Sequence, residues 1–334
     1  GSRGLGDVYK RQTYTRIREQ NLAGYAQYSH PLPFGQANIG LRYEHVDFDY
    51  FENATFVPGQ SRVYDNIFPN ISVNGQLGKV QFQVSYAAKT QRPNYSQLRN
   101  NITYANRFTW QTGNPLLKPS VTHDITAVGV WRFFQAMVSY KVVRDYILYW
   151  GTQVENQSAT TLINYINHDR LPSLTVMLAA SPTIGIWNLN ASAIVMKQWF
   201  SLDAAGQRRT YNNPLFVGSL NNTFTLPAGF LLSADFNYQS RGQVQNITLK
   251  RPQYTLNIGL RKSLFNDALS IEARANDLLL GCKQEALLYM ESAQMKDLSW
   301  SDTRSFSLTV RYKFNAAKSK YKGTGAGQDT INRM

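Results

Sequence analysis

Strict alternation of apolar and polar residues recurs along this chain and constrains its fold more than any other feature. In the run SFSLTVRYKF, residues 305–314, every second residue is apolar and the intervening residues are polar or charged. Successive side chains of a β-strand point to opposite faces, so this pattern is typical of a strand with one apolar face. The runs QANIGLRYEH, VQFQVSYAAK and FLLSADFNYQ repeat it. The sequence therefore predicts an all-β chain.

The links between the predicted strands separate two all-β architectures. We count thirteen strands, whose links are alternately short and long. The short links fall at 30–35, 77–79, 132–135, 181–185, 226–229 and 265–267, and the long links at 50–64, 90–121, 149–160, 199–213, 240–252 and 277–303. All long loops then emerge at one end, as in outer-membrane barrels with tight periplasmic turns. A Greek-key sandwich has no reason to alternate in this way. We predict an antiparallel up-and-down transmembrane β-barrel.

The polar face of the predicted strands indicates which side meets lipid. It is rich in Asn, Gln, Ser and Gly, with charges of both signs such as Asp235, Glu272 and Arg274. This composition suits a hydrated lumen, so the apolar face should point outward into lipid. Aromatic residues gather at both strand ends, like the girdles at the two membrane interfaces. They are Phe34, Phe134, Trp187, Phe230, Phe265, Tyr312 and Phe314 at the short-turn end, and Tyr43, Tyr86, Trp150, Trp199 and Tyr254 at the long-loop end.

Composition and motif content argue against several other classes of protein. The formal charge of +14 is spread along the whole chain, which favours a solvated basic surface over a nucleic-acid site. The four histidines show no metal-ligand spacing, and the single Cys282 can form no internal disulfide. His123 and Asp124 are adjacent in a predicted strand and so point to opposite faces, and no nucleophile motif accompanies them. We predict neither an enzyme nor a cofactor.

Three stretches resemble the C-terminal part of the barrel of TonB-dependent receptors, especially the outer-membrane β-barrel family common in Bacteroidetes-type bacteria. The first is TQRPNYSQLRNN followed by WQTGNPLLKPSVTHD, where Gly113, Asn114 and Pro115 form a turn and Pro119 favours extended backbone. The second is the terminal strand ending in Phe314, and the third is the tail KSKYKGTGAGQDTINRM. The resemblance covers roughly residues 13–334.

This resemblance implies a 22-stranded barrel around an N-terminal plug, preceded by a segment that contacts TonB. We find neither part here and expect a fragment, with about 13 C-terminal strands of such a barrel over residues 13–314. Residues 1–12 resemble translated adapter sequence and are expected to be a non-native leader, and 315–334 a short periplasmic extension. The terminal strand resembles the signal that barrel-assembly machinery reads, carried by Phe306, Leu308, Val310, Tyr312 and Phe314.

The longest link holds the best candidates for ligand contact. They are the aromatic and basic residues Arg92, Tyr95, Arg99, Tyr104, Arg107 and Trp110. Such side chains can stack on sugar rings or hold an anionic chelate. An alternative interpretation is that they only fold the loop against its neighbours.

The function implied by the resemblance is TonB-dependent uptake of a nutrient, such as a glycan or a siderophore, across the outer membrane of a Gram-negative bacterium. Its expected partners are outer-membrane lipid and lipopolysaccharide, the barrel-assembly machinery, the TonB system and a surface lipoprotein. Two other hypotheses stay open. One is a structural or adhesive outer-membrane barrel that transports nothing, and the other is a soluble basic binding protein.

Overall fold

The computed structural model describes residues 14–154, 157–291 and 294–314. The predicted leader, 1–12, and the predicted extension, 315–334, lie outside the described residues. Apart from the four-residue helix α2 (Tyr95–Leu98) and the 3-10 turns η1 (Pro58–Gln60) and η2 (Pro227–Gly229), the regular structure is β-strand. No described helix is long and apolar enough to cross a membrane. The all-β prediction is confirmed.

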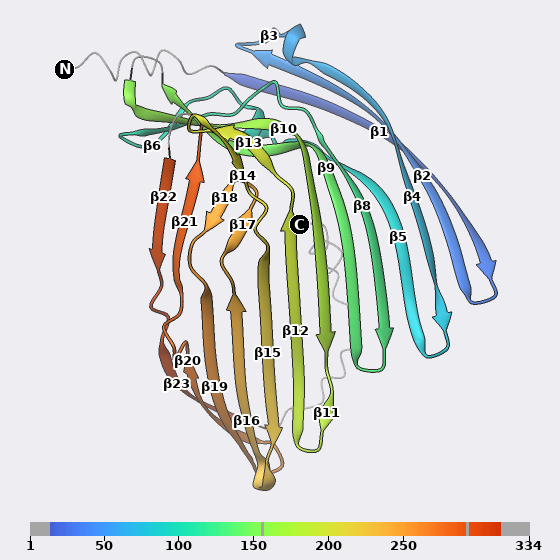
Figure 1. Cartoon of the computed structure of the whole chain (residues 1–334), viewed down its shortest axis with the longest axis vertical. Helices are drawn as coiled ribbons and strands as arrows, with labels where there is room; N and C mark the ends of the chain where they lie inside the picture. Colours follow the sequence, from blue (N-terminus) through green and yellow to red (C-terminus); the bar gives the residue numbers. More distant parts are fainter. Residues whose placement is uncertain (1–13, 155–156, 292–293, 315–334) are drawn as a thin grey trace.

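Thirteen long strands form a single antiparallel wall in which each strand pairs with the next long strand along the chain (Figure 1). They are β1 (Thr15–Leu32), β2 (Gly35–Glu52), β4 (Arg62–Leu77), β5 (Val80–Gln91), β8 (Ser120–Trp131), β9 (Phe134–Val154), β10 (Gln157–Ala180), β12 (Trp187–Gln198), β15 (Leu215–Thr225), β16 (Phe230–Gln239), β19 (Gln253–Leu264), β20 (Leu269–Asn276) and β23 (Ser305–Tyr312). Four short strands, β3 (Thr55–Phe56), β6 (Thr103–Asn106), β7 (Thr109–Gln111) and β11 (Thr183–Ile184), complete a 17-stranded sheet. This is the predicted up-and-down order.

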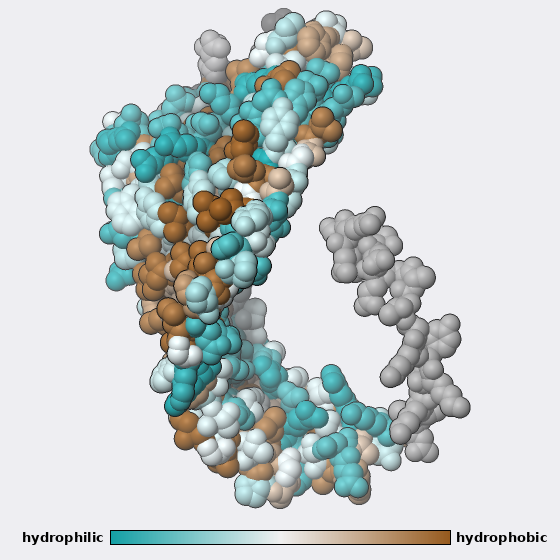
Figure 2. Space-filling view, turned by 90° about the vertical axis from the view of Figure 1, so that its right-hand side faces the viewer, coloured by the Kyte–Doolittle hydropathy of each residue, from teal (hydrophilic) through white to brown (hydrophobic). Residues whose placement is uncertain are grey.

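The wall is curved and open on one side, so the sheet does not close into a barrel (Figures 1 and 2). Within the described residues, β1 pairs only with β2 and β23 pairs only with β20. Figure 2 shows apolar side chains gathered over the middle of the convex face. The convex side is therefore the lipid-facing side, as the sequence predicted.

The strand register aligns apolar residues with apolar residues across the wall. Ile39 of β2 lies opposite Ile71, which lies opposite Tyr86, and the row continues through Ile125 and Tyr140. A shift of one residue would move each apolar set to the other face, so the register is fixed by burial in lipid.

The opposite face carries a ladder of polar contacts. The Ser29 hydroxyl donates to Asn38 at 2.7 Å, and the Asn38 amide donates to Ser72 at 3.3 Å. Farther along the wall, Thr126 and Ser139 both donate to the Asp124 carboxylate, at 2.8 and 2.9 Å. These are the contacts expected of a water-facing lumen wall.

The two ends of the wall differ as predicted. The links predicted to be short lie at one end of the wall, and the elaborated loops lie at the other (Figure 1). Two details of the prediction are wrong. The link expected at 149–160 is largely strand, because β9 continues to Val154 and β10 begins at Gln157. Trp150 is buried with Phe200 and Tyr211 in a core cluster, so it is absent from the outer aromatic girdle.

The long loops form two further small sheets at the loop end of the wall. One is the hairpin of β13 (Ser201–Ala204) and β14 (Gln207–Thr210). The other joins β17 (Gly242–Val244), β18 (Ile247–Leu249), β21 (Lys283–Tyr289) and β22 (Gln294–Trp300). In this second sheet Glu285 lies 3.2 Å from the Lys296 ammonium and 3.4 Å from the Arg251 guanidinium. The hydrogen bond from Lys296, followed by that from Arg251, lowers the pKa of the Glu285 carboxyl.

Candidate functional site

The loop between β5 and β8, residues 92–119, packs against the polar side of the wall. Leu98 and Leu117 of this loop are buried against Phe48 and Tyr50 of β2. Phe48 and Tyr50 follow the two-residue period of Asn38 and therefore share its lumen-facing side. The loop thus folds into the concave side of the wall, at its loop end.

Polar contacts tie the same loop to three strands of the wall. Arg92 forms an ion pair with Glu19 of β1. The Arg62 guanidinium of β4 donates to the backbone carbonyl of Leu116 at 2.8 Å. At the other side, β7 pairs in parallel with residues 161–163 of β10, and the Thr112 N–H donates to a β10 carbonyl at 2.9 Å. These ties hold the loop across the concave face.

The Gly-Asn-Pro turn fixes the chain where the loop turns back. A Cβ on Gly113 would lie 2.3 Å from the Arg99 carbonyl oxygen, so only glycine allows this approach. The Gly113 N–H donates to that same oxygen at 2.8 Å. The Asn114 side chain donates to the Tyr165 carbonyl at 2.9 Å and accepts from the Leu116 N–H at 3.0 Å. The motif is therefore a structural clasp between the loop and β10.

A hollow of about 460 Å³ opens between this clasp and the wall. Its lining residues are mostly hydroxyl, amide and guanidinium side chains with two tyrosines: Ser96, Arg99, Asn101, Thr103, Gln111, Thr112, Gly113, Tyr149, Ile163 and Tyr165. Tyr149 and Tyr165 lie directly opposite each other on β9 and β10 and meet edge to face at 5.7 Å. The Asn101 side-chain oxygen is buried and accepts no hydrogen bond from the described residues. The hollow can therefore receive a polar ligand of the size that protein pockets commonly bind.

The structure places some of the six predicted ligand residues at the hollow and others away from it. Arg99 lines the hollow, and Tyr95 stands half-exposed on α2 four residues before it. Tyr104 and Trp110 meet edge to face at 5.5 Å on the β6–β7 hairpin, whose Thr103 and Gln111 also line the hollow. In contrast, Arg92 lies apart in its ion pair with Glu19.

Arg107 lies at the tip of the β6–β7 hairpin, with its guanidinium 5.6 Å from the Phe108 ring. It does not line the hollow. Ligand contact by the six residues stays a prediction, and in the structure Arg92 also joins the loop to β1 through its ion pair with Glu19.

The sequence reasoning missed Tyr149, Tyr165 and Asn101. The two tyrosines belong to β9 and β10, whereas the predicted ligand residues all belong to the longest link. Tyr149 lies at the start of the link expected at 149–160 and Tyr165 lies beyond its end, and the two residues pair because this segment is largely strand. No sequence pattern marks Asn101 as a site residue, because its burial depends on how the loop folds.

Metal binding by acidic, histidine or cysteine side chains finds no support in the part of the chain that the structure describes. No group of three or more such residues there is arranged to hold an ion.

Comparison with protein families identifies the class of this chain. The model of the outer membrane protein beta-barrel family matches residues 8–312. The chain belongs to this family, and it is a protein of the Gram-negative outer membrane. The comparison with curated proteins gives no match.

Solved structures similar to this chain include transporters and receptors. They include the FrpB iron transporter of Neisseria meningitidis (TM-score 0.56, 13% identity, 92% of this chain and 46% of that one). The copper transporter OprC (0.59, 13%, 89% and 48%) and the ferric-catecholate import receptor Fiu of K12 E. coli (0.56, 13%, 90% and 45%) are also similar. The chain spans about half the length of each. The resemblance to barrels of TonB-dependent receptors is confirmed at the level of the fold.

Proposed function

We propose that this chain forms barrel wall in a TonB-dependent receptor that imports a nutrient, and that the hollow beside loop 92–119 contacts that nutrient. The observation that carries the proposal is a hollow on the concave side of an outer-membrane wall, lined by Arg99, Asn101 and further hydroxyl and amide side chains. Polar groups gathered in this way offer a bound polar ligand several hydrogen-bond partners at one place.

The lining indicates the chemistry of the nutrient. Arg99 offers a charged donor, and the hydroxyl and amide groups offer both donors and acceptors. An oxygen-rich ligand with hydroxyl groups and some negative charge fits this set, which includes a glycan and a catecholate-type siderophore. The Tyr149 and Tyr165 rings add aromatic surface for a sugar or catechol ring.

On this proposal the protein is a transporter and not an enzyme. Its partners are the TonB system, which energises import, the barrel-assembly machinery, which reads the terminal strand, and a surface lipoprotein that delivers the nutrient. The segment from Phe306 to Phe314 then serves assembly, while loop 92–119 serves binding.

The experiment compares two arginine variants of the full-length protein in cells. Uptake of a ferric catecholate and of a labelled oligosaccharide is measured with and without a functional TonB system. Charge-assisted hydrogen bonds contribute about 1.5–3 kcal/mol, so Arg99→Gln should slow uptake of the true substrate class by about 10-fold or more. Arg107→Gln, in the same loop but outside the hollow, should stay within about twofold.

Three outcomes decide between the hypotheses. Uptake that requires TonB and falls only in Arg99→Gln supports the proposal. Uptake that Arg99→Gln leaves unchanged removes the hollow as the binding site. Absence of TonB-dependent uptake across a broad panel of glycans and chelates, with a correctly assembled barrel, supports the structural or adhesive alternative.

A further inference from the structure

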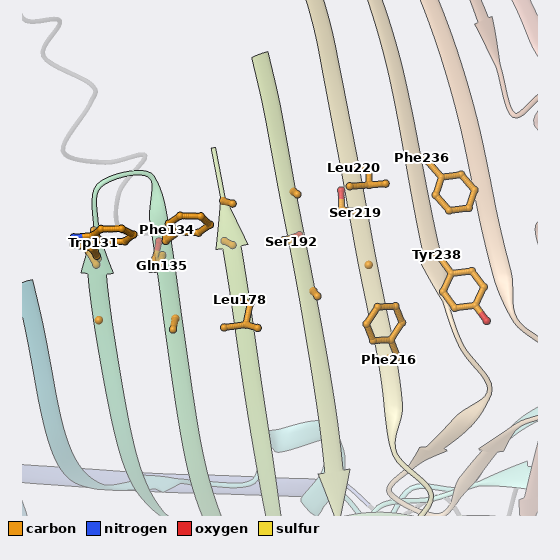
Figure 3. A pocket seen from close by; sticks show the side chains of 18 of the residues that line it. Trp131, Phe134, Gln135, Leu178, Ser192, Phe216, Ser219, Leu220, Phe236 and Tyr238 are labelled. Carbon is orange, nitrogen blue, oxygen red and sulfur yellow. The ribbon is translucent and has the colours of Figure 1, made fainter. Parts of the chain in front are cut away.

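The convex, lipid-facing side of the wall has a large apolar hollow of about 780 Å³ over β8 to β16 (Figure 3). Its floor is made of small residues that lie next to one another on adjacent strands. Ala180 lies opposite Ala191, and Ala193 lies opposite Gly218. Elsewhere on this face large side chains occupy such a row, as Ile and Tyr do in the row from Ile39 to Tyr140 described above. Small side chains therefore create the hollow.

Large apolar side chains stand on both sides of this floor. Trp131 and Phe134 stack at 5.8 Å at the β8–β9 turn. Across the floor lie Leu220 and Phe236, which are directly opposite each other on β15 and β16. Figure 3 shows the two aromatic side chains at the turn and the larger side chains of β15 and β16 on the far side.

The hollow runs from the membrane interface toward the bilayer centre. A continuous register row joins Phe134, Ala180, Ala191, Leu220 and Phe236. It crosses four strand spacings, or about 19 Å. On β9 the row starts at Phe134, next to the turn. On β16 it ends at Phe236, which lies six residues, or about 20 Å, beyond the first residue of that strand.

These two lengths fix the depth of the far end. If all turns lie at one membrane level, they imply a strand tilt of about 45°, which is the usual tilt of a transmembrane strand. At that tilt Phe236 lies about 14 Å above the turns, and Tyr238, which is two residues farther along β16 and also lines the hollow, lies about 19 Å above them. The hollow thus extends through the periplasmic leaflet and ends near the middle of the roughly 30 Å hydrocarbon core.

Positive charge lies at the shallow end of the hollow. The Arg132 guanidinium lies 5.0 Å from the Trp131 ring, at the β8–β9 turn beside the hollow. Lys79 lies in the neighbouring β4–β5 turn, next to Val80, which lines the hollow. A cation beside an interfacial tryptophan at the turn end is well placed for a lipid phosphate.

We propose that this hollow is a specific site for an anionic phospholipid of the periplasmic leaflet. One acyl chain lies along the floor of Ala180, Ala191 and Ala193, and the phosphate meets Arg132 at the turn. The hollow is continuous with the surface that lipid already covers, and it extends through the periplasmic leaflet, so an acyl chain is the occupant with the right chemistry. This inference does not depend on the nutrient or on the TonB system.

The test is native mass spectrometry of the full-length protein in detergent, titrated with phosphatidylglycerol or with zwitterionic phosphatidylcholine. Wild type should hold one phosphatidylglycerol more tightly than any further lipid. Ala191→Leu, which fills the floor, should weaken that first binding by about tenfold or more. Ala127→Leu adds the same bulk to the same face outside the hollow and should stay within about twofold. Arg132→Gln should weaken phosphatidylglycerol and leave phosphatidylcholine unchanged.

Heat-modifiable migration on gels confirms that each variant forms a folded barrel. If Ala191→Leu does not assemble, Ala193→Leu tests the same floor from the same strand. The proposal is overturned if the filled variants hold the first lipid as tightly as wild type, or if Ala127→Leu weakens it equally. A polypeptide found in the hollow in place of lipid also overturns it.

Discussion

Truncation of Leu117 should loosen loop 92–119 without disturbing the wall. The Leu117 side chain is 3% exposed and packs against Phe48 and Tyr50. Leu→Ala changes in such positions cost 2–5 kcal/mol, so we take about 3 kcal/mol for Leu117→Ala. Because this packing joins loop to wall, the cost falls on local opening of the loop. At 1.4 kcal/mol per factor of ten, the population of open loop should rise by about 150-fold.

Hydrogen exchange measures this opening directly. The N–H groups of Thr112, Gly113 and Asn114 donate to backbone carbonyls at 2.9, 2.8 and 2.6 Å, so they exchange only when the loop opens. Their exchange in Leu117→Ala should accelerate by about two orders of magnitude, while amides of the wall keep their rates. Leu116→Ala is the matched control, because Leu116 is 54% exposed and its removal should change exchange by less than threefold. Equal acceleration in the two variants, or none in either, would refute the reasoning.

Three further predictions concern other parts of the molecule. Gly113→Ala should place a methyl group against the Arg99 carbonyl, cost about 1–3 kcal/mol and reproduce the fast exchange of the loop; normal exchange would contradict the clasp. Because the pKa of Glu285 is lowered by Lys296, the carboxylate stabilises the β21–β22 hairpin above the ordinary glutamate pKa, and this stabilisation is lost as the pH falls through the folded-state pKa. Glu285→Gln should therefore exchange hairpin amides faster than wild type at pH 7 and equally at pH 2, and a difference that persists at pH 2 would argue against the ion pair. Phe314→Ala should reduce the yield of heat-modifiable barrel in outer membranes severalfold, measured against the total protein synthesised; an unchanged yield would remove this residue from the assembly signal.

The wall could be predicted from the sequence because the alternation of apolar and polar residues within each strand is enough to identify that strand. Residues 35–43 alternate between lipid and lumen, and the same period repeats in every long strand. Turn and loop lengths then set the order of strands, since neighbours in a meander are neighbours in the chain. The failure at 149–160 has a physical cause. Beyond the membrane, β9 and β10 pack against other loops, and Trp150 is buried there in a small hydrophobic core. The residues of this segment therefore lack the simple alternation of a strand between lipid and lumen.

The candidate site was less accessible to prediction because it is assembled from distant segments. The composition of loop 92–119 identified Arg99 as a candidate. The position of the loop, however, depends on its contacts with Glu19, Arg62 and Tyr165, which lie in three different strands. The parallel pairing of β7 with β10 joins residues about 50 positions apart and leaves no local pattern. The same holds for the lipid-side hollow, where alanine and glycine residues are unremarkable along each strand and significant only across strands.

The clasp also sets an order of events during folding. Each contact of loop 92–119 with β10 closes a chain segment of roughly 50 residues, and long closures are slow and entropically costly. The hairpin of β9 and β10 must exist before Thr112 and Asn114 can find their carbonyl acceptors. The hollow beside loop 92–119 is consequently among the last features to form, and only a wall that has already assembled correctly presents it to the outside.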